Sequence, residues 1–541
     1  IRDHCVTGVQ TCALPISLLR NNTLERQRVM GNFYADLTFT KGLTFRSEIG
    51  FDDNHSLNKA FNPTFNWGRI SNNINSMRQR EESSFFWILK NYLTYNLKMG
   101  DQHNLVAMLG TEAQRSEWQG SNVTKYNFAS NDIHVLSEGD DQGSPGTTTD
   151  GWKGASSIAS YFGRFNYNFA DRYLITLTLR ADGSSKFGSE NRWGYFPSGS
   201  FAWRLTEEEW MPKSDALTNV KLRLGYGEVG NQAIDNYLYG SSMQSFPSYF
   251  GTAYRPEKIA NPKLKWEATK QYNIGADMSL LSGHIDLTVD LYKKFTSDML
   301  LQLSVPSYLG GSDYRDIRAP VANIGRMENK GIDIALTSYN VRKKNFSWTT
   351  NLTFTLNRNM IKELEKEQAT MWGNLYWYSE FQTATMTRAG HPIGVFYGYL
   401  TDGLFENEQD ILSHAVQVLD QSSVTPANPK GKNLADRRDG VWIGDVKFRD
   451  MNGDGVIDTD DQRVIGDPNP DFTGGLNNSF TFGPFDLVVY LTGSYGADIL
   501  NYQRVEIEGM TSIYNNQTKA VDNRARYALK NPAGSDIDPS N

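Results

Sequence analysis

The sequence predicts an all-β protein, a transmembrane antiparallel β-barrel with long extracellular loops. Three observations predict this fold. Apolar and polar residues alternate along many segments, most of these segments are long enough to cross a bilayer, and short and long connections alternate between them. The pattern recurs from residue 28 to residue 500, so it describes one architecture rather than a local feature.

The alternation has a period of two residues and is clearest in the segment 173–180. Its apolar face carries Tyr173, Ile175, Leu177 and Leu179, and its opposite face carries Thr176, Thr178 and Arg180. The segments 220–226, 285–292 and 348–357 repeat this pattern. One face of each segment therefore meets apolar surroundings while the other meets water.

We expect fourteen strands, most of them longer than the roughly 9–11 residues that a tilted strand needs to cross a bilayer. Their ranges are 28–40, 42–52, 83–98, 102–117, 154–169, 171–182, 193–206, 217–228, 264–280, 282–298, 325–341, 345–361, 469–483 and 485–500.

The connections between these strands fall into two alternating sets. The short set is 41–42, 100–101, 170–171, 282–283, 342–344 and 483–484, with a longer member at 206–217. The long set is 53–82, 118–153, 183–192, 229–263, 299–324 and 362–468. Short turns at one end and long loops at the other are typical of outer-membrane barrels.

Two other all-β architectures also alternate. Strands of a soluble β-sandwich are usually about five or six residues long, shorter than most of the strands expected here. A β-solenoid would show a fixed short repeat, and the sequence has none. The barrel is therefore the favoured fold.

Composition excludes several classes of function. The 541 residues include 54 Lys and Arg against 61 Asp and Glu, for a net charge of −7. A general nucleic-acid-binding protein needs a basic face, so we expect no nucleic-acid partner. No run of eighteen apolar residues exists, so a membrane-spanning form of this chain must use a closed sheet.

The first sixteen residues differ from the rest. They contain the only two cysteines, Cys5 and Cys12, and Val6–Ile16 reads VTGVQTCALPI. This stretch resembles the translation of a sequencing-adapter oligonucleotide, and it lacks the basic and apolar regions of a signal peptide. We interpret residues 1–16 as an artefact and 17–541 as the partial barrel domain; a Cys5–Cys12 disulfide is the alternative.

Several longer stretches carry a family resemblance. They include DRYLITLTLRADGSSKFG at 171–188, VKLRLGYGEVGNQ at 220–232, NPKLKWEATKQYNIGAD at 261–277 and DVKFRDMNGDGVIDTDDQRVIGDPNPDFTGGLNN at 445–478. In this order they resemble the SusC/RagA family of TonB-dependent outer-membrane transporters. The resemblance covers the chain from about residue 20 to its end.

The resemblance implies a location and a function. Members of that family are large plugged barrels that cross the bacterial outer membrane many times, in contact with its lipid, and import oligosaccharides or peptides. They act with a SusD-like lipoprotein and draw energy from the TonB complex through the plug. This sequence shows no plug and no TonB-box segment, so we expect an incomplete barrel of about 14 of about 22 strands.

Other functions remain open at this point. A TonB-dependent receptor for a metal chelate or a vitamin is the first alternative, and an outer-membrane adhesin or barrel enzyme is the second. Catalytic constellations are absent: the seven histidines form no H-E-x-x-H motif, and no G-x-S-x-G elbow occurs. We therefore expect a transporter and not an enzyme.

The strongest local motif is DMNGDGVIDTDD at 450–461, inside the long connection 362–468. It fits a twelve-residue calcium loop, in which oxygen ligands surround a sharp glycine turn. The expected ligands are Asp450, Asn452, Asp454, the Val456 carbonyl, Asp458 and Asp461. Position 12 is Asp instead of the usual Glu, and the alternative is a solvated turn. We expect a structural Ca²⁺ ion here.

Two further motifs are weaker. The same long connection holds four aromatic residues, Trp372, Tyr376, Trp377 and Tyr378, which could stack on a ligand, pack the loop or anchor it at the membrane rim. The stretch GYGEVG at 225–230 matches G-x-G-x-x-G, but no helix follows it. We therefore interpret it as the end of a strand rather than a nucleotide site.

Overall fold

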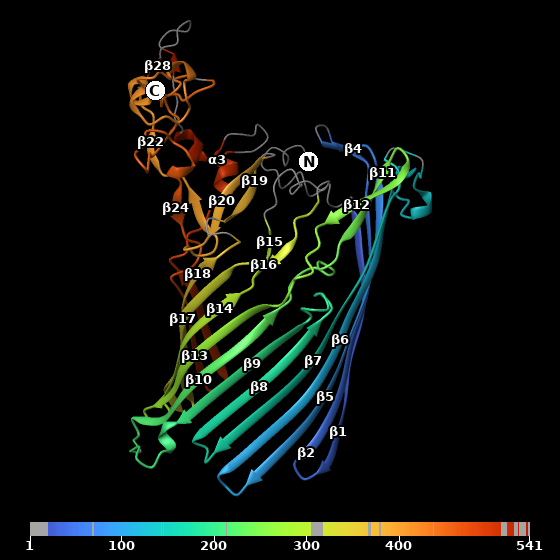
Figure 1. Cartoon of the computed structure of the whole chain (residues 1–541), viewed down its shortest axis with the longest axis vertical. Helices are drawn as coiled ribbons and strands as arrows, with labels where there is room; N and C mark the ends of the chain where they lie inside the picture. Colours follow the sequence, from blue (N-terminus) through green and yellow to red (C-terminus); the bar gives the residue numbers. More distant parts are fainter. Residues whose placement is uncertain are drawn as a thin grey trace. The chain divides into compact units, whose positions relative to one another are not determined.

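A computed structural model of the chain (Figure 1) describes residues 20–67, 70–141, 143, 145–212, 214–303, 317–365, 369–377, 380–436, 438–509, 517–523, 528–529 and 537–538. The segment 1–16, which the sequence marks as an artefact, lies outside these described residues. By its internal contacts the chain forms two units, residues 1–282 with 294–324 and residues 283–293 with 325–541.

Fourteen long strands lie in chain order in one antiparallel sheet. Nine belong to the first unit: β1 Asn21–Thr40, β2 Leu43–Asn62, β5 Ser76–Met99, β6 His103–Tyr126, β7 Thr148–Phe169, β8 Tyr173–Ser184, β9 Trp193–Arg204, β10 Leu217–Asn231 and β13 Glu267–Leu280. The remaining five are β14 Ile285–Ser297, β17 Arg326–Lys343, β18 Phe346–Glu363, β25 Phe472–Phe482 and β26 Phe485–Tyr495.

The long connections contain shorter elements of their own. The strands are β3 Phe65–Trp67, β4 Ile70–Asn72, β11 Ser242–Ser248, β12 Gly251–Lys258, β15 Leu300–Gln302, β16 Val321–Asn323, β19 Thr370–Trp377, β20 Glu380–Arg388, β21 Val395–Gly398, β22 Thr401–Leu404, β23 Val446–Phe448, β24 Arg463–Gly466, β27 Ala528–Leu529 and β28 Ile537–Asp538. The helices are η1 Leu136–Glu138, η2 Leu205–Glu207, α2 Glu408–Ser413, η4 Gln421–Ser423, η5 Thr459–Asp461, α3 Tyr502–Glu508 and η6 Lys519–Asn523. Among the described residues, no helix is long and apolar enough to span a membrane.

The structure confirms the predicted fold class and all fourteen predicted strands, but it moves their ends. The largest differences lie at the loop ends of β2, β5 and β6, which run to Asn62, Ser76 and Tyr126. There the β2–β5 and β5–β6 ladders continue through polar pairs such as Asn58 opposite Arg80. Backbone pairing needs no apolar face, so these ends carry no apolar alternation for the sequence to reveal.

Register sets which side chains share a face of the first unit. Phe45, Leu93, Leu109, Gly163 and Leu179 lie opposite one another across five successive strands. Paired residues in a sheet point to the same side. The exposed large apolar side chains on this face include Leu109, Tyr161, Leu177, Leu179, Tyr195, Leu224 and Ile274. This apolar face is the one that meets lipid, because the lumen of such a barrel is polar.

An aromatic group marks the short-turn end of the apolar face. Phe169, Tyr173, Phe201 and Trp203 lie on β7, β8 and β9, with ring centroids 6.2 to 6.4 Å apart and nearly parallel planes. The adjoining turn is the predicted dipeptide Ala170-Asp171, where both residues have φ near +54°. Two positive φ values are the geometry of a type I′ hairpin turn. Aromatic rings at this level suit a membrane–water interface.

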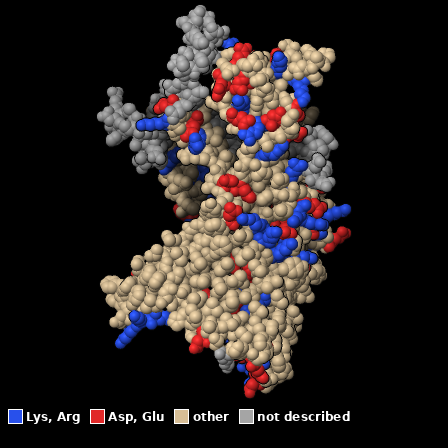
Figure 2. Space-filling view, turned by 90° about the vertical axis from the view of Figure 1, so that its left-hand side faces the viewer, with Lys and Arg blue, Asp and Glu red and all other residues tan. Residues whose placement is uncertain are grey.

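Figure 2 shows a broad area of surface with few Lys, Arg, Asp or Glu side chains. Such an area fits the apolar belt of a membrane barrel, where a charged side chain on the lipid face is costly.

The assignment of the two faces of β8 can be tested by introducing Arg at either of two adjacent positions, one on each face. Replacing Leu177 by Arg on the apolar face should cost about 2–4 kcal/mol if the site lies near the bilayer midplane. Replacing Thr176 by Arg on the opposite face should cost about 1 kcal/mol or less, since it removes one hydrogen bond to Asn166. Urea unfolding from lipid vesicles, with protein made from its complete reading frame, measures both. A larger loss at Thr176 would reverse the assignment of the faces.

Candidate functional site

The polar face of the first unit carries a network centred on Arg180 of β8. Its Nε donates to Asp182 Oδ1 at 2.8 Å, and its Nη2 donates to Glu112 Oε1 at 3.0 Å and to Ser160 Oγ at 2.9 Å. Ser160 and Asp182 are buried, with 1% and 8% of their surface exposed. The guanidinium thus joins β6, β7 and β8 by charge-assisted hydrogen bonds.

The network extends to two more strands. Glu48, Lys90 and Glu112 are register partners on β2, β5 and β6, and Lys90 Nζ lies 3.6 Å from Glu48 Oε1. Charges of opposite sign therefore alternate across β2, β5 and β6, and Arg180 of β8 pairs with Glu112 across the neutral Ser160 of β7. The sequence showed Arg180 on a polar face but could not group it with Glu48, because only the strand register brings them together. Such a surface can bind polar groups in a wet lumen.

The hairpin β11–β12, within the predicted loop 229–263, presents aromatic side chains to solvent. Tyr249 and Phe250 at its tip are 96% and 94% exposed, with ring centroids 5.3 Å apart in an edge-to-face contact. Arg255 lies over the ring of Phe246, and Tyr254 is also exposed. Exposed rings of this kind suit contact with a ligand or a partner. The sequence analysis missed this hairpin, although its aromatic residues were visible.

The predicted aromatic cluster is only partly described. Trp372 on β19 is half-exposed and its ring centroid lies 5.6 Å from that of Tyr397 on β21. Tyr376 and Trp377 lie on β19 opposite Phe381 and Glu380 of β20. Tyr378 falls outside the described residues. Ligand contact by these four residues therefore stays a prediction.

Residues 395–466, which we call the loop module, fold around a small core of Phe405, Ile411 and Val441. Asn433, 2% exposed, holds this module together. Its Oδ1 accepts from the Gln417 and Val418 amides, and its Nδ2 donates to the carbonyls of Ile411, His414 and Ala415. A single buried amide thus satisfies five backbone groups that no helix or sheet would otherwise pair.

Two ion pairs fasten β22, β23 and α2 within the loop module. The Arg449 guanidinium, 2.5 Å from Asp402, holds the pKa of that carboxyl below its usual value. Lys447 lies 3.2 Å from Asp410. Burial raises the pKa of Asp410, but the Glu406 amide and the Lys447 ammonium outweigh it, so the net shift is downward. Both carboxylates are therefore ionised at neutral pH.

The predicted calcium loop belongs to the same module, because the Val416 amide donates to Gly455 O and the Ile457 amide to Val416 O. Its side chains accept hydrogen bonds from the loop's own backbone. Asp450 accepts from the amides of Gly453 and Gly455 at 2.6 and 2.8 Å. Asn452, Asp454 and Asp458 each accept from the amide two residues ahead. Gly455, at position 6, has φ of +83°, which the sharp turn requires.

Asp461, at position 12, is fully buried. It accepts from the amides of Met451 at 2.7 Å and Asp458 at 2.9 Å, and it closes a capping box with Asp458. Burial raises its pKa, but these backbone donors outweigh burial and lower it overall. Among the described residues, no group of three or more His, Cys, Asp or Glu is arranged to hold a metal ion. Calcium binding by this loop, including the Val456 carbonyl, therefore stays a prediction.

The side chains of three of the described histidines have a hydrogen-bond partner close by. His103 Nδ1 lies 2.7 Å from the Tyr167 hydroxyl, His134 Nε2 lies 2.8 Å from Asn131 O, and His414 Nε2 lies 2.7 Å from Phe448 O. These contacts fix loops and strand ends. They bring no nucleophile and base together.

Comparison with known proteins places this sheet and its loops in a family. Residues 15–430 match the family model described as TonB dependent receptor-like, beta-barrel. The chain belongs to this family. It is therefore a protein of the bacterial outer membrane, in a family of transporters and receptors. The resemblance identified from the sequence is confirmed.

Curated relatives carry the same family name. The chain is 30% identical over 504 residues to TonB-dependent receptor P3 of Formosa agariphila, a match that covers 91% of this chain and 47% of that protein. It is 30% identical over 353 residues to TonB-dependent receptor SusC of Bacteroides thetaiotaomicron, covering 63% of this chain and 31% of that protein. The chain thus spans about half the length, 47% to 50%, of the three Formosa relatives that it matches.

A solved structure shares the fold. The structure of the RagAB peptide transporter matches with a TM-score of 0.76 and 22% identity, over 91% of this chain and 50% of that chain. At this identity the match shows the fold alone. Together with the family match, this fold makes the fourteen-stranded sheet part of the wall of a TonB-dependent receptor barrel.

In this TonB-dependent receptor, Asn433 should be the most sensitive polar residue of the loop module. Asn433→Ala leaves buried backbone groups without partners and should destabilise the module by about 1–3 kcal/mol. Limited proteolysis of the folded protein should then cut within 395–466 several times faster, while the barrel resists. Ser422→Ala, an exposed change in the same module, serves as the control. Equal cleavage of the two variants would contradict the role given to Asn433.

Proposed function

We propose that this protein imports a large nutrient, an oligosaccharide or a peptide, across the outer membrane in a TonB-dependent manner. It acts as a transporter and not as an enzyme. The observation that carries the proposal is the match of nearly the whole chain to the fold of RagAB, described as a peptide transporter, together with the sequence match to SusC. Both substrate classes follow from the resemblance, and both are polar chains.

The lumen-facing network supports a polar cargo. Glu48, Lys90, Glu112, Arg180 and Asp182 offer hydrogen-bond donors and acceptors on four strands, β2, β5, β6 and β8. An oligosaccharide or a peptide needs donors and acceptors at many points along its path. A compact apolar ligand would gain nothing from such a wall.

We infer two protein partners. A SusD-like lipoprotein would cover the long-loop end, where the β11–β12 hairpin offers Tyr249 and Phe250 to a protein surface. The TonB complex would supply energy through the plug that relatives of this type contain. Outer-membrane lipid surrounds the apolar face.

Uptake by cells of the source organism tests the proposal. A strain that lacks the gene should lose uptake of either a set of fluorescent oligosaccharides or a set of fluorescent peptides, and the complete gene should restore it. Deleting TonB should abolish the same uptake, because the energy comes from the inner membrane. Whichever set responds identifies the substrate class.

Two outcomes would refute this function. The deletion strain could take up both the oligosaccharides and the peptides normally but lose uptake of a ferric chelate or a vitamin. That result would establish a different substrate. Uptake that persists without TonB would remove the energy coupling.

We also propose that the loop at 450–461 binds Ca²⁺ weakly as a structural ion. The donor set suits a hard cation, because it consists of carboxylate, amide and backbone oxygens. Each carboxylate oxygen that accepts one amide keeps a second lone pair for a ligand. Asp450, Asp454 and Asp458 also crowd one short loop, so a cation would relieve their repulsion. A dissociation constant of about 10⁻⁴–10⁻³ M, as in extracellular modules, would suffice.

Calorimetry with CaCl₂ on the intact protein tests the calcium proposal. Asp454→Ala should abolish the binding heat, since it removes the ligand at position 5. Asp439→Ala changes an acidic residue of the same module outside the loop and should keep it. Calcium should also slow proteolysis of the loop relative to chelator. No heat in the parent protein, with equal proteolysis in calcium and chelator, would leave only a hydrogen-bonded turn.

A further inference from the structure

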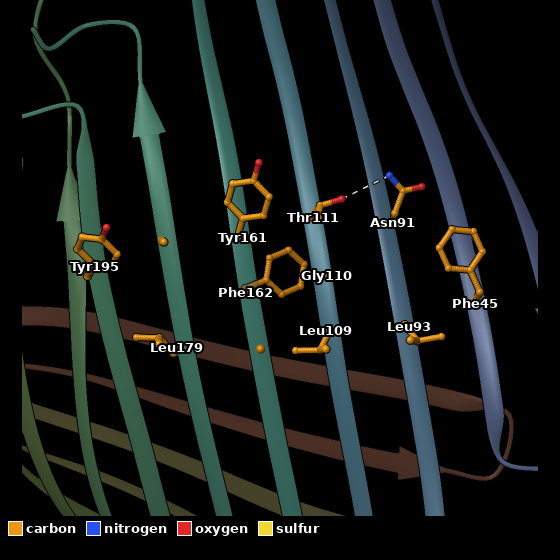
Figure 3. A pocket seen from close by; sticks show the side chains of 12 residues that line it. Phe45, Asn91, Leu93, Leu109, Gly110, Thr111, Tyr161, Phe162, Leu179 and Tyr195 are labelled. Carbon is orange, nitrogen blue, oxygen red and sulfur yellow. Dashed lines mark hydrogen bonds between the residues drawn. The ribbon is translucent and has the colours of Figure 1, made fainter. Parts of the chain in front are cut away.

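The apolar face of the first unit has a hollow centred on β7 (Figure 3). Gly163 contributes no side chain, and its register partners on either side are Leu109 of β6 and Leu179 of β8. The hollow has a volume of about 600 Å³, and its walls include Phe45, Leu93, Tyr161 and Tyr195. A second hollow of about 630 Å³ adjoins it and shares Leu109, Gly163 and Leu179. Together they form one apolar groove that continues toward the short turns, past Phe165 and Leu177.

The loop-side rim of this groove is polar. Ser47, Asn91 and Thr111 are register partners on β2, β5 and β6, two residues along from Phe45, Leu93 and Leu109, so they share the apolar face. Ser47 Oγ donates to Asn91 Oδ1 at 2.9 Å, and Asn91 Nδ2 donates to Thr111 Oγ1 at 3.5 Å (Figure 3). The second bond is long, and among the described residues the Thr111 hydroxyl has no acceptor for its own hydrogen. The rim therefore has hydrogen-bonding capacity to spare.

The position of the rim along the strands sets its depth. Asn91 and Thr111 each lie eight residues from Met99 and His103, the ends of β5 and β6 at their short turn. At about 3.3 Å per residue and a tilt of about 45°, the rim stands roughly 19 Å above that turn. The apolar belt of such barrels is about 25 Å tall. The rim thus lies in the half of the membrane nearer the long loops, which is the outer leaflet.

We propose that this groove is a binding site for one lipid of the outer leaflet. The acyl chain lies along Gly163 between Leu109 and Leu179, and the oxygen-bearing end of the chain meets Asn91 and Thr111. The direction of polarity carries the argument. An outer-leaflet lipid has its polar end toward the loops and its chain toward the membrane centre, and the groove has the same order. A lipid of the opposite leaflet would place the apolar end of its acyl chain, rather than its polar end, against Asn91 and Thr111.

Selectivity comes from the rim rather than from apolar contact. Inside a bilayer, protein and lipid tails are equally apolar, so filling the groove with a chain gains little by itself. A polar side chain that faces hydrocarbon without partners is unfavourable, and an ester carbonyl or a hydroxyl on the lipid would satisfy it. The polar trio occurs beside the hollow, whereas Leu224 and Ile274 on β10 and β13 continue the same face with apolar side chains.

Native mass spectrometry of the protein, made from its complete reading frame and washed in delipidating detergent, tests the proposal. The parent protein should keep one lipid per chain. The double variant Asn91→Leu with Thr111→Val should lower retention about tenfold, the effect expected for a hydrogen-bonded polar group inside a membrane. Ala181→Trp, which fills the hollow beside Tyr161 and Tyr195, should abolish retention. Ile274→Trp, on the same face but outside the groove, should leave it unchanged.

Folding of each variant is checked by its resistance to unheated SDS, so that loss of lipid is separated from loss of structure. Three results would overturn the proposal. The parent protein could retain no lipid, or all folded variants could retain equal amounts. A parent protein that carries no lipid and has the mass of a dimer, with the dimer lost in Ala181→Trp, would instead show that a second copy of the chain occupies the groove.

Discussion

The rest of this structure depends on the requirement that backbone N–H and C=O groups inside a membrane find partners within the protein. The chain meets that requirement with one antiparallel ladder of fourteen strands. Once the ladder fixes the register, it also fixes every face, because successive side chains point to opposite sides. The lipid surface, the lumen surface and the groove at Gly163 are therefore consequences of pairing, and a shift of one residue would exchange the two faces.

The sequence predicted those paired strands whose two faces meet different surroundings, lipid on one side and water on the other. The strand containing Leu177 and Thr178 was visible because its two faces meet different solvents. The upper half of β6, around Asn122, was not, because both of its faces carry polar residues there. Hairpins such as β11–β12 were missed because their strands also lack a clear alternation of polar and apolar residues. The turn at Gly251, with φ of +100°, is recognisable in the sequence only once the strands beside it are known.

The sites divide in a similar way. The motif at 450–461 was predictable because all its residues lie in one short stretch, and the structure gives it the sharp glycine turn that the motif requires. What the sequence could not show is that Asp461 is buried and engaged by backbone amides. The Arg180 network and the role of Asn433 were unpredictable in principle, since their partners are assembled by register and by loop packing across large sequence separations.

The polar and apolar faces also explain why the groove stands out. On the lumen side a polar residue needs no special account, because water can satisfy it. On the lipid side the same residue must have a partner, so Asn91 and Thr111 are informative while Thr176 and Thr178 are not. A polar side chain that the strand register places on the lipid-facing side indicates that its surroundings are not hydrocarbon alone. Beside Gly163 that disagreement coincides with an empty space of matching orientation, and a bound lipid resolves both.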